Sequence, residues 1–554
     1  MSFIVKKKIA GKEYYYLQKS VREGNKIKSK FISYLGKNLE DAKMKAEKIK
    51  ELEEKNIIPY KESETKIISK ISIEELANFC KRKGFVYPSG DIYGGLGGFW
   101  DFGHLGTELV NNIKNQWKIY HIQKRDDLVL VDGSIITNPK VWEASGHVSS
   151  FVDLAVECKK CKYKSKIDKH ELKNAKCDKC GSEYENKGEF NPMFTTQIGP
   201  IKENSTKAYL RPETAQLIFA NFKLIQENAR LQLPFGIAQI GKSFRNEISP
   251  REFLFRAREF EQMEIEYFIE QDQHCPYIDE IKKIKILIYD EKSQKENSSP
   301  ILMNLYEACK KGIIKTDWHA YWIGKEFKWF TSLGANPNNF RARQHLSEEK
   351  SHYSIDTWDL EYNFPMGWRE LEGFANRGDF DLKQHQNYSK YSMELTKSDG
   401  KKIMPHVVCE PSLGIGRALI VFLLESYYFN KETNTTILKL HPKLSPIKCS
   451  IFPIIKKPEY EHIAKKILDD LRNEFNCEYD ISGSIGRRYA RNDEIGTPYC
   501  ITIDEESIKN KDITIRERDT KEQIRVKIKN LRKIMKKLIN EEINFTEAGR
   551  PIKK

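Results

Sequence analysis

The sequence feature that most constrains this chain is the stretch 244–260, FRNEISPREFLFRAREF. Two alternating runs flank a Ser-Pro turn, a pattern that is typical of an antiparallel hairpin. The stretch also contains four arginines, at positions 245, 251, 256 and 258. Guanidinium groups stay charged and donate in a fixed fork that suits phosphate, and Phe260 offers a flat face to a base. The stretch therefore predicts a nucleotide-binding hairpin, and the alternative is a solvated basic hairpin.

Two further segments support the first interpretation. Residues 410–417, EPSLGIGR, predict a glycine-rich turn that ends in an arginine at a helix start, and residues 210–216 read LRPETAQ. The hairpin, with its Arg-x-Glu head and its Arg-x-x-x-Phe end, resembles motif 2 of the class II aminoacyl-tRNA synthetases. EPSLGIGR resembles motif 3. Together with LRPETAQ, these segments resemble the dimeric, single-chain glycyl-tRNA synthetases over about residues 73–525.

The resemblance implies a glycine–tRNA ligase. Such an enzyme activates glycine with ATP and Mg²⁺ to glycyl-adenylate, and then transfers glycine to the 3′ end of tRNA-Gly. The carboxylate attacks the α-phosphate directly, so the enzyme positions the reactants and stabilises charge. The implied catalytic residues are Arg245 on the α-phosphate, Glu247 on the adenine amino group and Arg417 at the γ-phosphate.

The resemblance also implies the remaining nucleotide contacts. Phe260 is expected to stack under adenine, while Glu370 and Glu410 are expected to share Mg²⁺, which prefers oxygen ligands. The full implied set of ATP-binding residues is Arg245, Asn246, Glu247, Phe255, Arg256, Phe260, Glu370, Leu371, Glu410, Gly414, Gly416 and Arg417.

Glycine has no side chain, so its pocket must hold its two charged ends and exclude a methyl group. The implied glycine-binding residues are Arg125, Glu213, Phe260, Glu264, Glu410, Ser412 and Gly414. Arg125 is expected to reach the glycine carboxylate, and its alternative is an ion pair with Asp126 or Asp127. For Glu264 the alternative is a salt bridge within the hairpin. Glu266 alternates to the same face of the strand and is a second candidate for the ammonium group.

The spacing Cys-x2-Cys-x15-Cys-x2-Cys is the clearest metal signal. Two such pairs close a tetrahedral thiolate site, and four thiolates select zinc over hard cations. With all four ligands supplied by the chain, we expect a structural Zn²⁺ rather than a catalytic one, and the alternative is four buried free thiols. The ligands are Cys158, Cys161, Cys177 and Cys180.

Composition sets broader limits. The 554 residues include 94 Lys+Arg against 79 Asp+Glu, and a net charge of +15 favours a polyanionic partner such as tRNA. Eleven cysteines, with four of them clustered, favour a reducing compartment and a metal over a disulfide framework. The sequence has no apolar run of membrane-spanning length and no signal-peptide pattern at its start. We therefore expect a cytoplasmic enzyme without a membrane partner.

The expected fold class is α+β, with three parts. Residues 1–65 predict a small basic β-meander and a helix, which either contact RNA or pack with one face solvated, and are weakly similar to basic modules of some transposases. Residues 66–445 are expected to form an antiparallel-sheet catalytic core with helices. This core contains a zinc-binding insertion at 150–190 and a helical insertion at 270–350 that approaches the acceptor arm.

In residues 446–554, strands alternate with helices, which predicts an α/β unit. The unit resembles the class IIa anticodon-binding domain. The arginines expected to face RNA, with a solvated surface as the alternative, are Arg487, Arg488, Arg491 and Arg516.

The helix expected over 106–117 resembles motif 1, which builds the homodimer interface in this class. His104 stands where that family usually has proline. Two rival functions stay open: a synthetase-like RNA-binding regulator that has lost charging, and a zinc-containing DNA-binding protein.

Overall fold

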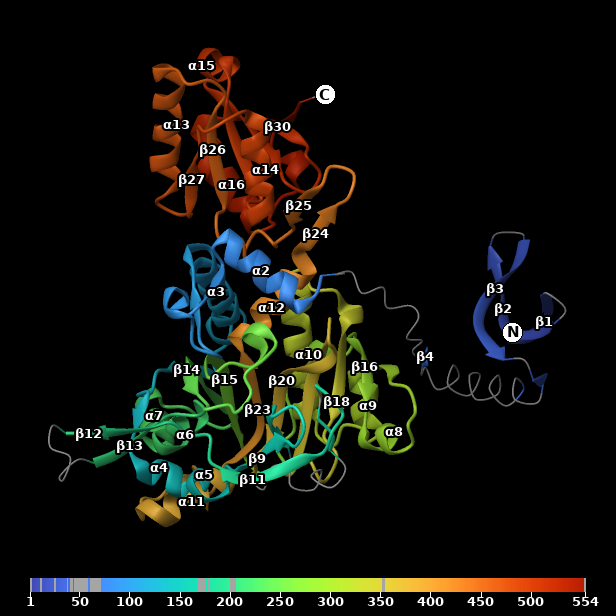
Figure 1. Cartoon of the computed structure of the whole chain (residues 1–554), viewed down its shortest axis with the longest axis vertical. Helices are drawn as coiled ribbons and strands as arrows, with labels where there is room; N and C mark the ends of the chain where they lie inside the picture. Colours follow the sequence, from blue (N-terminus) through green and yellow to red (C-terminus); the bar gives the residue numbers. More distant parts are fainter. Residues whose placement is uncertain are drawn as a thin grey trace.

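The computed structural model describes residues 2–9, 12–23, 26–36, 38–39, 43, 58–59, 71–167, 175–177, 179–199, 206–350 and 354–552. Figure 1 shows a large body built on a central sheet, a smaller C-terminal unit above it, and a small N-terminal sheet that lies apart from the body. Among the residues so described, no helix is both long enough and apolar enough to cross a membrane.

The N-terminal sheet is the meander expected from the sequence. It consists of the antiparallel strands β1 (Ser2–Ile9), β2 (Lys12–Glu23) and β3 (Lys26–Gly36). Tyr15 is buried on it and donates a hydrogen bond to Glu13 over 3.1 Å. Packing within the sheet thus accounts for this tyrosine. Most of the helix expected after this meander falls on residues outside the described ranges.

The body is organised around a 10-stranded sheet in the order β4-β17-β16-β18-β19-β20-β23-β15-β14-β7. β7 runs parallel to β14 and β16 parallel to β18, while all other neighbours are antiparallel. The strands are β4 (Ile58–Pro59), β7 (Leu128–Val131), β14 (Phe235–Phe244), β15 (Glu259–Ile269), β16 (Lys285–Tyr289), β17 (Ile301–Asn304), β18 (Phe340–Gln344), β19 (Asp356–Phe364), β20 (Gly367–Asn376) and β23 (His406–Gly414).

The expectation of a helical insertion at 270–350 was wrong. This segment supplies three strands of the central sheet, β16, β17 and β18, and its longest helix, α10 (Asp317–Ser332), is buried in the main core. Short apolar runs such as KILIY in β16 have no length or period that separates a buried strand from a helix. Pairing with the neighbouring strands decides the outcome here.

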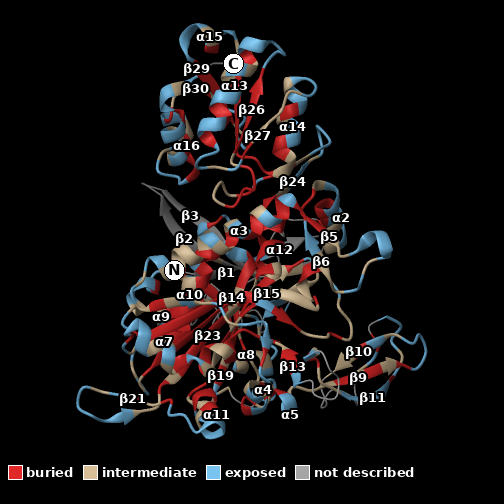
Figure 2. Cartoon of the chain, turned by 90° about the vertical axis from the view of Figure 1, so that its left-hand side faces the viewer, coloured by how far each residue is buried: buried red, intermediate tan, exposed pale blue. Residues whose placement is uncertain are grey.

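Helices cover both faces of the sheet. On one face, α10 shares the main apolar core with α3 (His104–Lys118) and α12 (Ile415–Ser426). On the other face lie α6 (Ala215–Ala220) and α7 (Phe222–Ala229). Side chains alternate along a strand, so β15 turns Met263, Ile265 and Tyr267 to the main core and Glu264 and Glu266 to the opposite side. Figure 2 shows β14, β15 and β23 in the buried centre of the body.

Local signals fix where several helices begin. α2 (Ile73–Lys83) starts with a capping box in which Ser72 and Glu75 satisfy each other's backbone N–H groups. The Thr316 side chain caps α10, and α13 (Pro458–Leu471) begins at a proline. α3 begins at His104, the first helical position, where proline is favoured because its missing N–H is not needed. Histidine in place of the family's proline is therefore compatible with the same helix start.

The C-terminal unit has the predicted α/β character and its own apolar core. Its 6-stranded sheet has the order β27-β26-β28-β29-β30-β31 and shares this core with α13 and α16 (Leu531–Ile539). The helix α14 (Ile485–Ile495) contacts the sheet through the Tyr489 and Phe452 rings. Its strands are β26 (Cys449–Pro453), β27 (Cys477–Tyr479), β28 (Tyr499–Ile503), β29 (Asp512–Glu517), β30 (Gln523–Lys527) and β31 (Arg550–Pro551). The Lys83–Glu494 ion pair, at 2.6 Å, ties the unit to the body.

A small module, which we call the cysteine insert, lies between residues 153 and 190. It is a three-stranded sheet in the order β10-β9-β11, made of β9 (Asp153–Cys158), β10 (Lys164–Ile167) and β11 (Tyr184–Phe190). Leu154, Val156 and Tyr184 form a small apolar cluster of its own. A core this small usually needs another source of stability, such as a structural metal. The four cysteines of the insert are candidates to bind one.

Candidate active site

Strands β14 and β15 form the predicted antiparallel hairpin, and their register pairs Phe244 with Glu259. The loop between them is irregular, because Glu252 and Phe253 both adopt positive φ and a short 3-10 turn, Phe253–Phe255, follows. Motif 3 crosses this loop at close range. A Cβ atom on Gly416 would lie 2.9 Å from the carbonyl oxygen of Leu254, so the crossing requires glycine.

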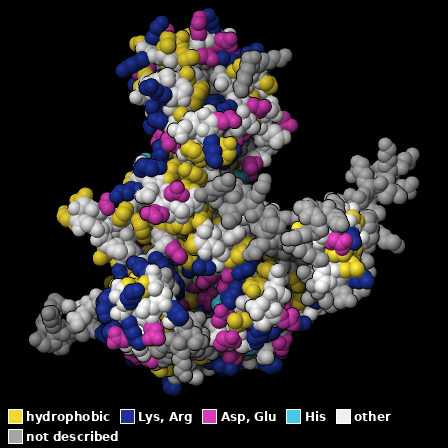
Figure 3. Space-filling model, turned by 45° about the vertical axis from the view of Figure 1, so that its right-hand side comes forward, with side chains coloured by type: hydrophobic (Ala, Val, Ile, Leu, Met, Phe, Trp, Pro, Cys, Tyr) yellow, Lys and Arg dark blue, Asp and Glu magenta, His cyan; other side chains and the backbone are white. Residues whose placement is uncertain are grey.

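The hairpin and the start of α12 enclose a cavity of about 280 Å³, which we call the motif 2 cavity. Nine of the predicted ATP-binding residues line it: Arg245, Glu247, Phe255, Arg256, Phe260, Glu370, Gly414, Gly416 and Arg417. Three others, Asn246, Leu371 and Glu410, are not among its lining residues. Figure 3 shows acidic side chains gathered in a hollow of the lower body, with Lys and Arg side chains around its rim.

Two arginines that line the motif 2 cavity are each held on an aromatic ring. The Arg245 guanidinium lies 5.4 Å from the centre of the Phe260 ring and donates to the Pro212 carbonyl over 2.9 Å. The Arg417 guanidinium lies 4.5 Å from the Phe255 ring and pairs with Glu370 over 2.9 Å. This pairing with Arg417 lowers the pKa of Glu370. Two fixed cations and a flat ring are the groups that a nucleotide needs.

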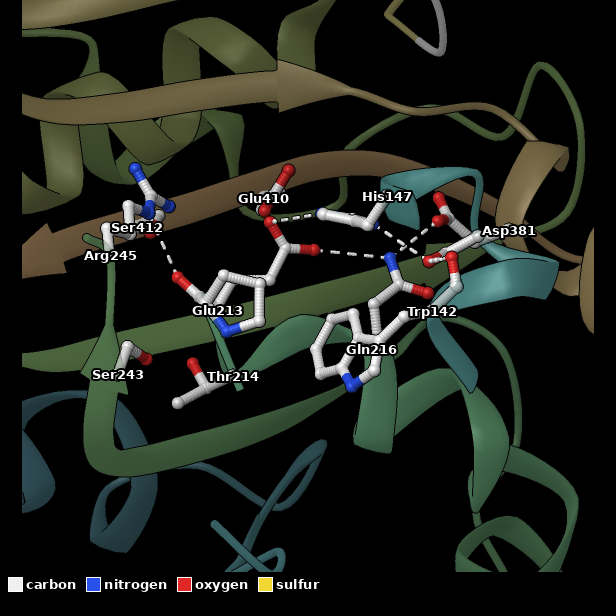
Figure 4. A network of polar contacts seen from close by, with 12 residues as sticks. Trp142, His147, Glu213, Thr214, Gln216, Ser243, Arg245, Asp381, Glu410 and Ser412 are labelled. Carbon is white, nitrogen blue, oxygen red and sulfur yellow. Dashed lines mark hydrogen bonds and ion pairs between the residues drawn. The ribbon is translucent and has the colours of Figure 1, made fainter. Parts of the chain in front are cut away.

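Beside the cavity lie four buried carboxyl groups, which we call the acidic floor: Glu213, Glu264, Glu266 and Glu410. Ser412 links floor and cavity, because its hydroxyl accepts from Gln262 over 3.1 Å and donates to Glu264 over 2.7 Å. The Thr214 hydroxyl donates to the second oxygen of Glu264. Figure 4 shows this network, with Arg245 and Ser412 at one end and Gln216 and Asp381 at the other.

Fixed partners hold two members of the floor. His147 contacts Glu213 over 3.3 Å, and Gln216 donates to it over 3.2 Å. Arg377, itself fully buried, donates to Glu410 over 3.0 Å and to both oxygens of Asp381. In contrast, neither oxygen of Glu266 has a hydrogen-bond partner among the described residues.

Burial and mutual repulsion set the ionisation of the floor. Burial raises the pKa of Glu410 to about 8 against the opposing charge of Arg377. Burial, with the charge of Glu410, also raises the pKa of Glu266 well above its usual range, and burial with the charge of Glu213 raises that of Glu264. For Glu213, burial is outweighed by His147, and its pKa falls. At neutral pH the acidic floor therefore contains both protonated and ionised carboxyl groups. A cation that binds there favours the ionised form, so its binding would release a proton.

Two expectations are not supported by this geometry. The Arg125 guanidinium pairs with Asp127 over 2.6 Å and lies 4.6 Å from the Tyr277 ring. Asp127 also accepts from Tyr267, which projects from the face of β15 opposite to Glu264. The sheet thus separates Arg125 from the acidic floor, and the alternative of an ion pair with Asp127 is the one observed.

The second concerns the shared Mg²⁺ ligands. Glu410 pairs with Ala375 across the sheet, so Glu370 lies five residues further along β20, roughly 16 Å away along the strand. The structure groups Glu410 with the acidic floor and Glu370 with Arg417. These two carboxylates are not brought together around one ion.

The four predicted cysteine ligands converge in the cysteine insert. All four sulfur atoms lie within 4.8 Å of one another, and two of the distances are 3.4 Å (Cys158–Cys180) and 3.5 Å (Cys161–Cys177). A regular tetrahedron of sulfurs about 2.3 Å from a metal has edges of about 3.8 Å, so this donor set fits a thiolate-bound metal. Burial opposes ionisation of Cys158, but a hydrogen bond from the Cys161 backbone and the nearby thiols lower its pKa to about 6.

Of the C-terminal arginines expected to face RNA, two are structural. Arg488 is buried and donates to the carbonyls of Gly483 and Pro453, and Arg516 forms a bidentate pair with Asp493. For these two the expectation was wrong. Arg491 is half-exposed and pairs with Asp480 over 2.5 Å.

Sequence reasoning missed several residues of the site. Lys166 and Gln262 line the motif 2 cavity, while Arg377 and His147 hold the floor. Gln262 had an available signal, because it precedes Glu264 by two residues and so shares its face of the strand. Lys166, Arg377 and His147 come from distant segments, and only the fold brings them to the site.

Comparisons with known proteins show which proteins this chain is similar to. The family "tRNA synthetase class II core domain (G, H, P, S and T)" matches residues 194–427, and the family "Anticodon binding domain" matches residues 448–538. The glycine–tRNA ligase of Bifidobacterium longum is 41% identical over 483 residues, which cover 82% of this chain and 90% of that protein. That of Geobacillus thermodenitrificans is 41% identical over 501 residues, or 84% of this chain and 98% of that one.

Among solved structures, the prolyl-tRNA synthetase of Cryptosporidium parvum matches with a TM-score of 0.52 at 14% identity. The match covers 87% of this chain and 79% of that one. At this identity the likeness concerns the fold alone.

Proposed function

The chain belongs to the glycine–tRNA ligase family, and from that premise we propose that it activates glycine with ATP and transfers it to the 3′ end of a tRNA. The observation that carries the proposal is the junction of two sites: a cavity with fixed arginines and a flat ring opens beside a buried acidic floor. A nucleoside triphosphate fits the motif 2 cavity, and the ammonium end of a small amino acid fits the acidic floor. Ser412, shared by both, joins them.

For activation, we assign ATP to the motif 2 cavity. Adenine lies on Phe260 with its amino group toward Glu247, and Arg245 contacts the α-phosphate that the glycine carboxylate attacks. Arg417, at the other end, holds the γ-phosphate. Both guanidiniums are positioned before substrate arrives, so the charge that develops on the phosphate meets fixed donors rather than reorganising solvent.

For selection, we assign the glycine ammonium group to the acidic floor, where Glu213 and Glu264 accept from it with Ser412 nearby. The hydroxyls of Thr214 and Ser412 already hold Glu264 in place. A floor so tightly packed leaves little room for a side chain, and filling the wall of a pocket turns one added methyl group into a clash. Glu266, which faces the same side, supplies a further carboxyl group to this floor.

We assign two metals to the protein. Zn²⁺ fits the four cysteines and would stabilise the cysteine insert without taking part in the reaction, because all its ligand positions are filled by the chain. Mg²⁺ would accompany ATP and neutralise phosphate charge, with Glu370 as the carboxylate that lines the motif 2 cavity.

For the wider assembly, we assign residues 1–65 to an appendage whose β4 pairs with β17 at the edge of the central sheet, 66–445 to the catalytic unit and 446–554 to tRNA anticodon binding. We also assign a homodimer to the motif 1 region. Ile92, Tyr93 and Leu96, in the loop before α3, are 87%, 89% and 60% exposed. Three large apolar side chains in one exposed loop are typical of a surface that a partner covers.

The test is transfer of labelled glycine to unmodified tRNA-Gly in the presence of ATP and Mg²⁺. The proposal predicts glycine bound to the 3′ end, with no transfer when ATP is omitted. An RNA-binding regulator or a DNA-binding protein would give no charged tRNA under any of these conditions. Binding of the tRNA without transfer would contradict the proposal.

A further inference from the structure

The cysteine insert contacts the motif 2 cavity directly, at two points. The Tyr163 hydroxyl hydrogen bonds to the Ser249 hydroxyl of the motif 2 loop over 2.8 Å. Lys166, on β10, lines the motif 2 cavity, and its ammonium lies 3.6 Å from an oxygen of Glu247. The residue assigned to the adenine amino group is therefore in contact with a module that supplies none of the other assigned nucleotide contacts.

The Lys166 ammonium is itself held in position. It donates to Asp153, at the start of β9, over 2.8 Å, so it bridges the cysteine insert and Glu247. The Glu247 oxygen that it approaches is buried and has no hydrogen-bond partner among the described residues. Arg256 reaches it only at 4.0 Å. A buried carboxylate oxygen without a donor is costly, so this site gains when a ligand supplies an N–H group.

The path from Lys166 to the cysteines is short and rigid. β10 pairs with β9, which ends at Cys158, and the Cys158 backbone N–H donates to the Tyr163 carbonyl over 2.8 Å. Both contact residues, Tyr163 and Lys166, thus lie within eight residues of a cysteine ligand and on the hairpin that this ligand closes. A metal that fixes the cysteines also fixes the Lys166 side of the cavity.

We propose that Lys166 is a positioning residue for base recognition: it holds Glu247 in the orientation that accepts the adenine amino group, and the metal-loaded cysteine insert thereby sets the preference for adenine. The inference rests on the proposed function, because it takes the motif 2 cavity as the ATP site. It assigns the cysteine insert a role in choosing the nucleotide, beyond stabilising its own fold.

The test compares ATP with inosine triphosphate, which carries an oxygen in place of the 6-amino group. Dissociation constants of both are measured by calorimetry on the full, metal-loaded chain. Lys166→Ala should weaken ATP binding by about tenfold, the effect of one contact to a charged group, and leave inosine triphosphate binding nearly unchanged. Lys166→Arg should restore most of the preference. Lys164→Ala, an exposed lysine on the same strand, is the matched control and should match the wild type.

Equal weakening of both nucleotides in Lys166→Ala would overturn the proposal, because it would put the ammonium on the phosphates. Unchanged ATP binding, or an equal change in Lys164→Ala, would overturn it as well. Metal removal by a chelator should reduce the preference for ATP as Lys166→Ala does, and should add nothing in that variant. A metal-free chain that is folded, by circular dichroism, and keeps the full preference would overturn the link to the insert.

The failure of this inference is distinguishable from the failure of the proposed function. If the wild-type chain performs glycine-dependent pyrophosphate exchange and Lys166→Ala keeps the nucleotide preference, only the inference about Lys166 is contradicted. If the wild-type chain shows no such exchange, the proposed function is contradicted, whatever the nucleotide preference.

Discussion

At the scale of single residues, the site combines cations that are fixed before substrate arrives with carboxyl groups that are partly protonated. Arg245 and Arg417 each have a ring beneath the guanidinium and a backbone or carboxylate acceptor. Glu410 has one strong partner, Arg377, in a surrounding that otherwise disfavours its charge. The first arrangement suits charge that develops on a phosphate, and the second suits an incoming ammonium group.

Replacing either arginine by alanine should nearly abolish activation. Removal of one charged donor from a transition state costs about 2.7–4 kcal/mol, or roughly 10²–10³ in rate. The measurement is glycine-dependent pyrophosphate exchange by Arg245→Ala and Arg417→Ala, with circular dichroism as the check on folding. Arg491→Ala, on the C-terminal unit, is the control and should exchange normally. Near-normal exchange in either motif variant with Mg²⁺ present would remove that arginine from the mechanism.

Glycine binding should release a proton. With its pKa near 8, Glu410 is protonated in the free protein at neutral pH, and an ammonium ion favours the ionised form. Glycine affinity should therefore rise with pH up to about 8, by at most one decade per pH unit, and then level off. Calorimetry at pH 7 in two buffers of different ionisation enthalpy measures the released proton. Glu410→Gln should reduce the release, while Glu264 and Glu266, whose pKa values are also raised, remain in the floor. Equal heats in both buffers for the wild type would contradict this.

At the scale of elements, the site depends on three segments that meet at their ends: the β14–β15 hairpin, the β23–α12 turn and the cysteine insert. The first two meet at Gly416, where a Cβ atom would overlap the Leu254 carbonyl. The closeness of this crossing keeps Arg417 beside the Phe255 ring. The glycine is thus required by the approach of two backbones and not by its own φ angle.

Gly416→Ala should weaken ATP binding by displacing the motif 2 loop, since overpacking typically costs about 1–3 kcal/mol. The measurement is the dissociation constant of ATP together with the melting temperature. Gly486→Ala is the control, because it also lies in a helix and its Cβ atom would meet nothing within 4 Å. If the dissociation constant of ATP is the same in both variants, the close contact between Gly416 and the Leu254 carbonyl does not shape the motif 2 cavity.

Sequence patterns predicted the elements with strong local signals and failed where long-range pairing decides. The hairpin, the motif 3 turn and the four cysteines each have a fixed spacing, and the structure contains all three. Arg125 and Arg488 were misassigned, because the sequence does not show that Arg125 pairs with Asp127 or that Arg488 is buried against the carbonyls of Gly483 and Pro453. The strands β16 to β18 were missed because their short apolar runs do not distinguish a buried strand from a helix, and only the fold brings β16 beside its parallel neighbour β18.

At the scale of the whole molecule, the described residues that form the motif 2 cavity and the acidic floor all lie between positions 147 and 417. The small N-terminal sheet lies apart from them in Figure 1, and the C-terminal unit has its own core. Activation of the amino acid is thus assigned to one part of the chain, and recognition of the tRNA to others.

Deletion of residues 1–36, which contain the N-terminal sheet, should leave glycine-dependent pyrophosphate exchange unchanged, because that step needs no tRNA and β4, which pairs with β17 at the edge of the central sheet, is kept. Binding of tRNA-Gly at several salt concentrations then assigns the role of the segment. A salt slope lower by about one unit for each lost phosphate contact would show that the segment touches RNA. An unchanged slope would make it an appendage for another partner. Loss of exchange on deletion would contradict the assignment of activation to the body alone.

The most direct test of the proposed function is pyrophosphate exchange by the wild-type chain without tRNA, with glycine, alanine and serine compared at equal concentration. The proposed function predicts exchange with glycine, because its ammonium group reaches the acidic floor while its carboxylate faces the α-phosphate. It predicts far slower exchange with alanine and serine, whose side chains meet the packed floor. Exchange that is absent with glycine, or equally fast with alanine, would contradict it.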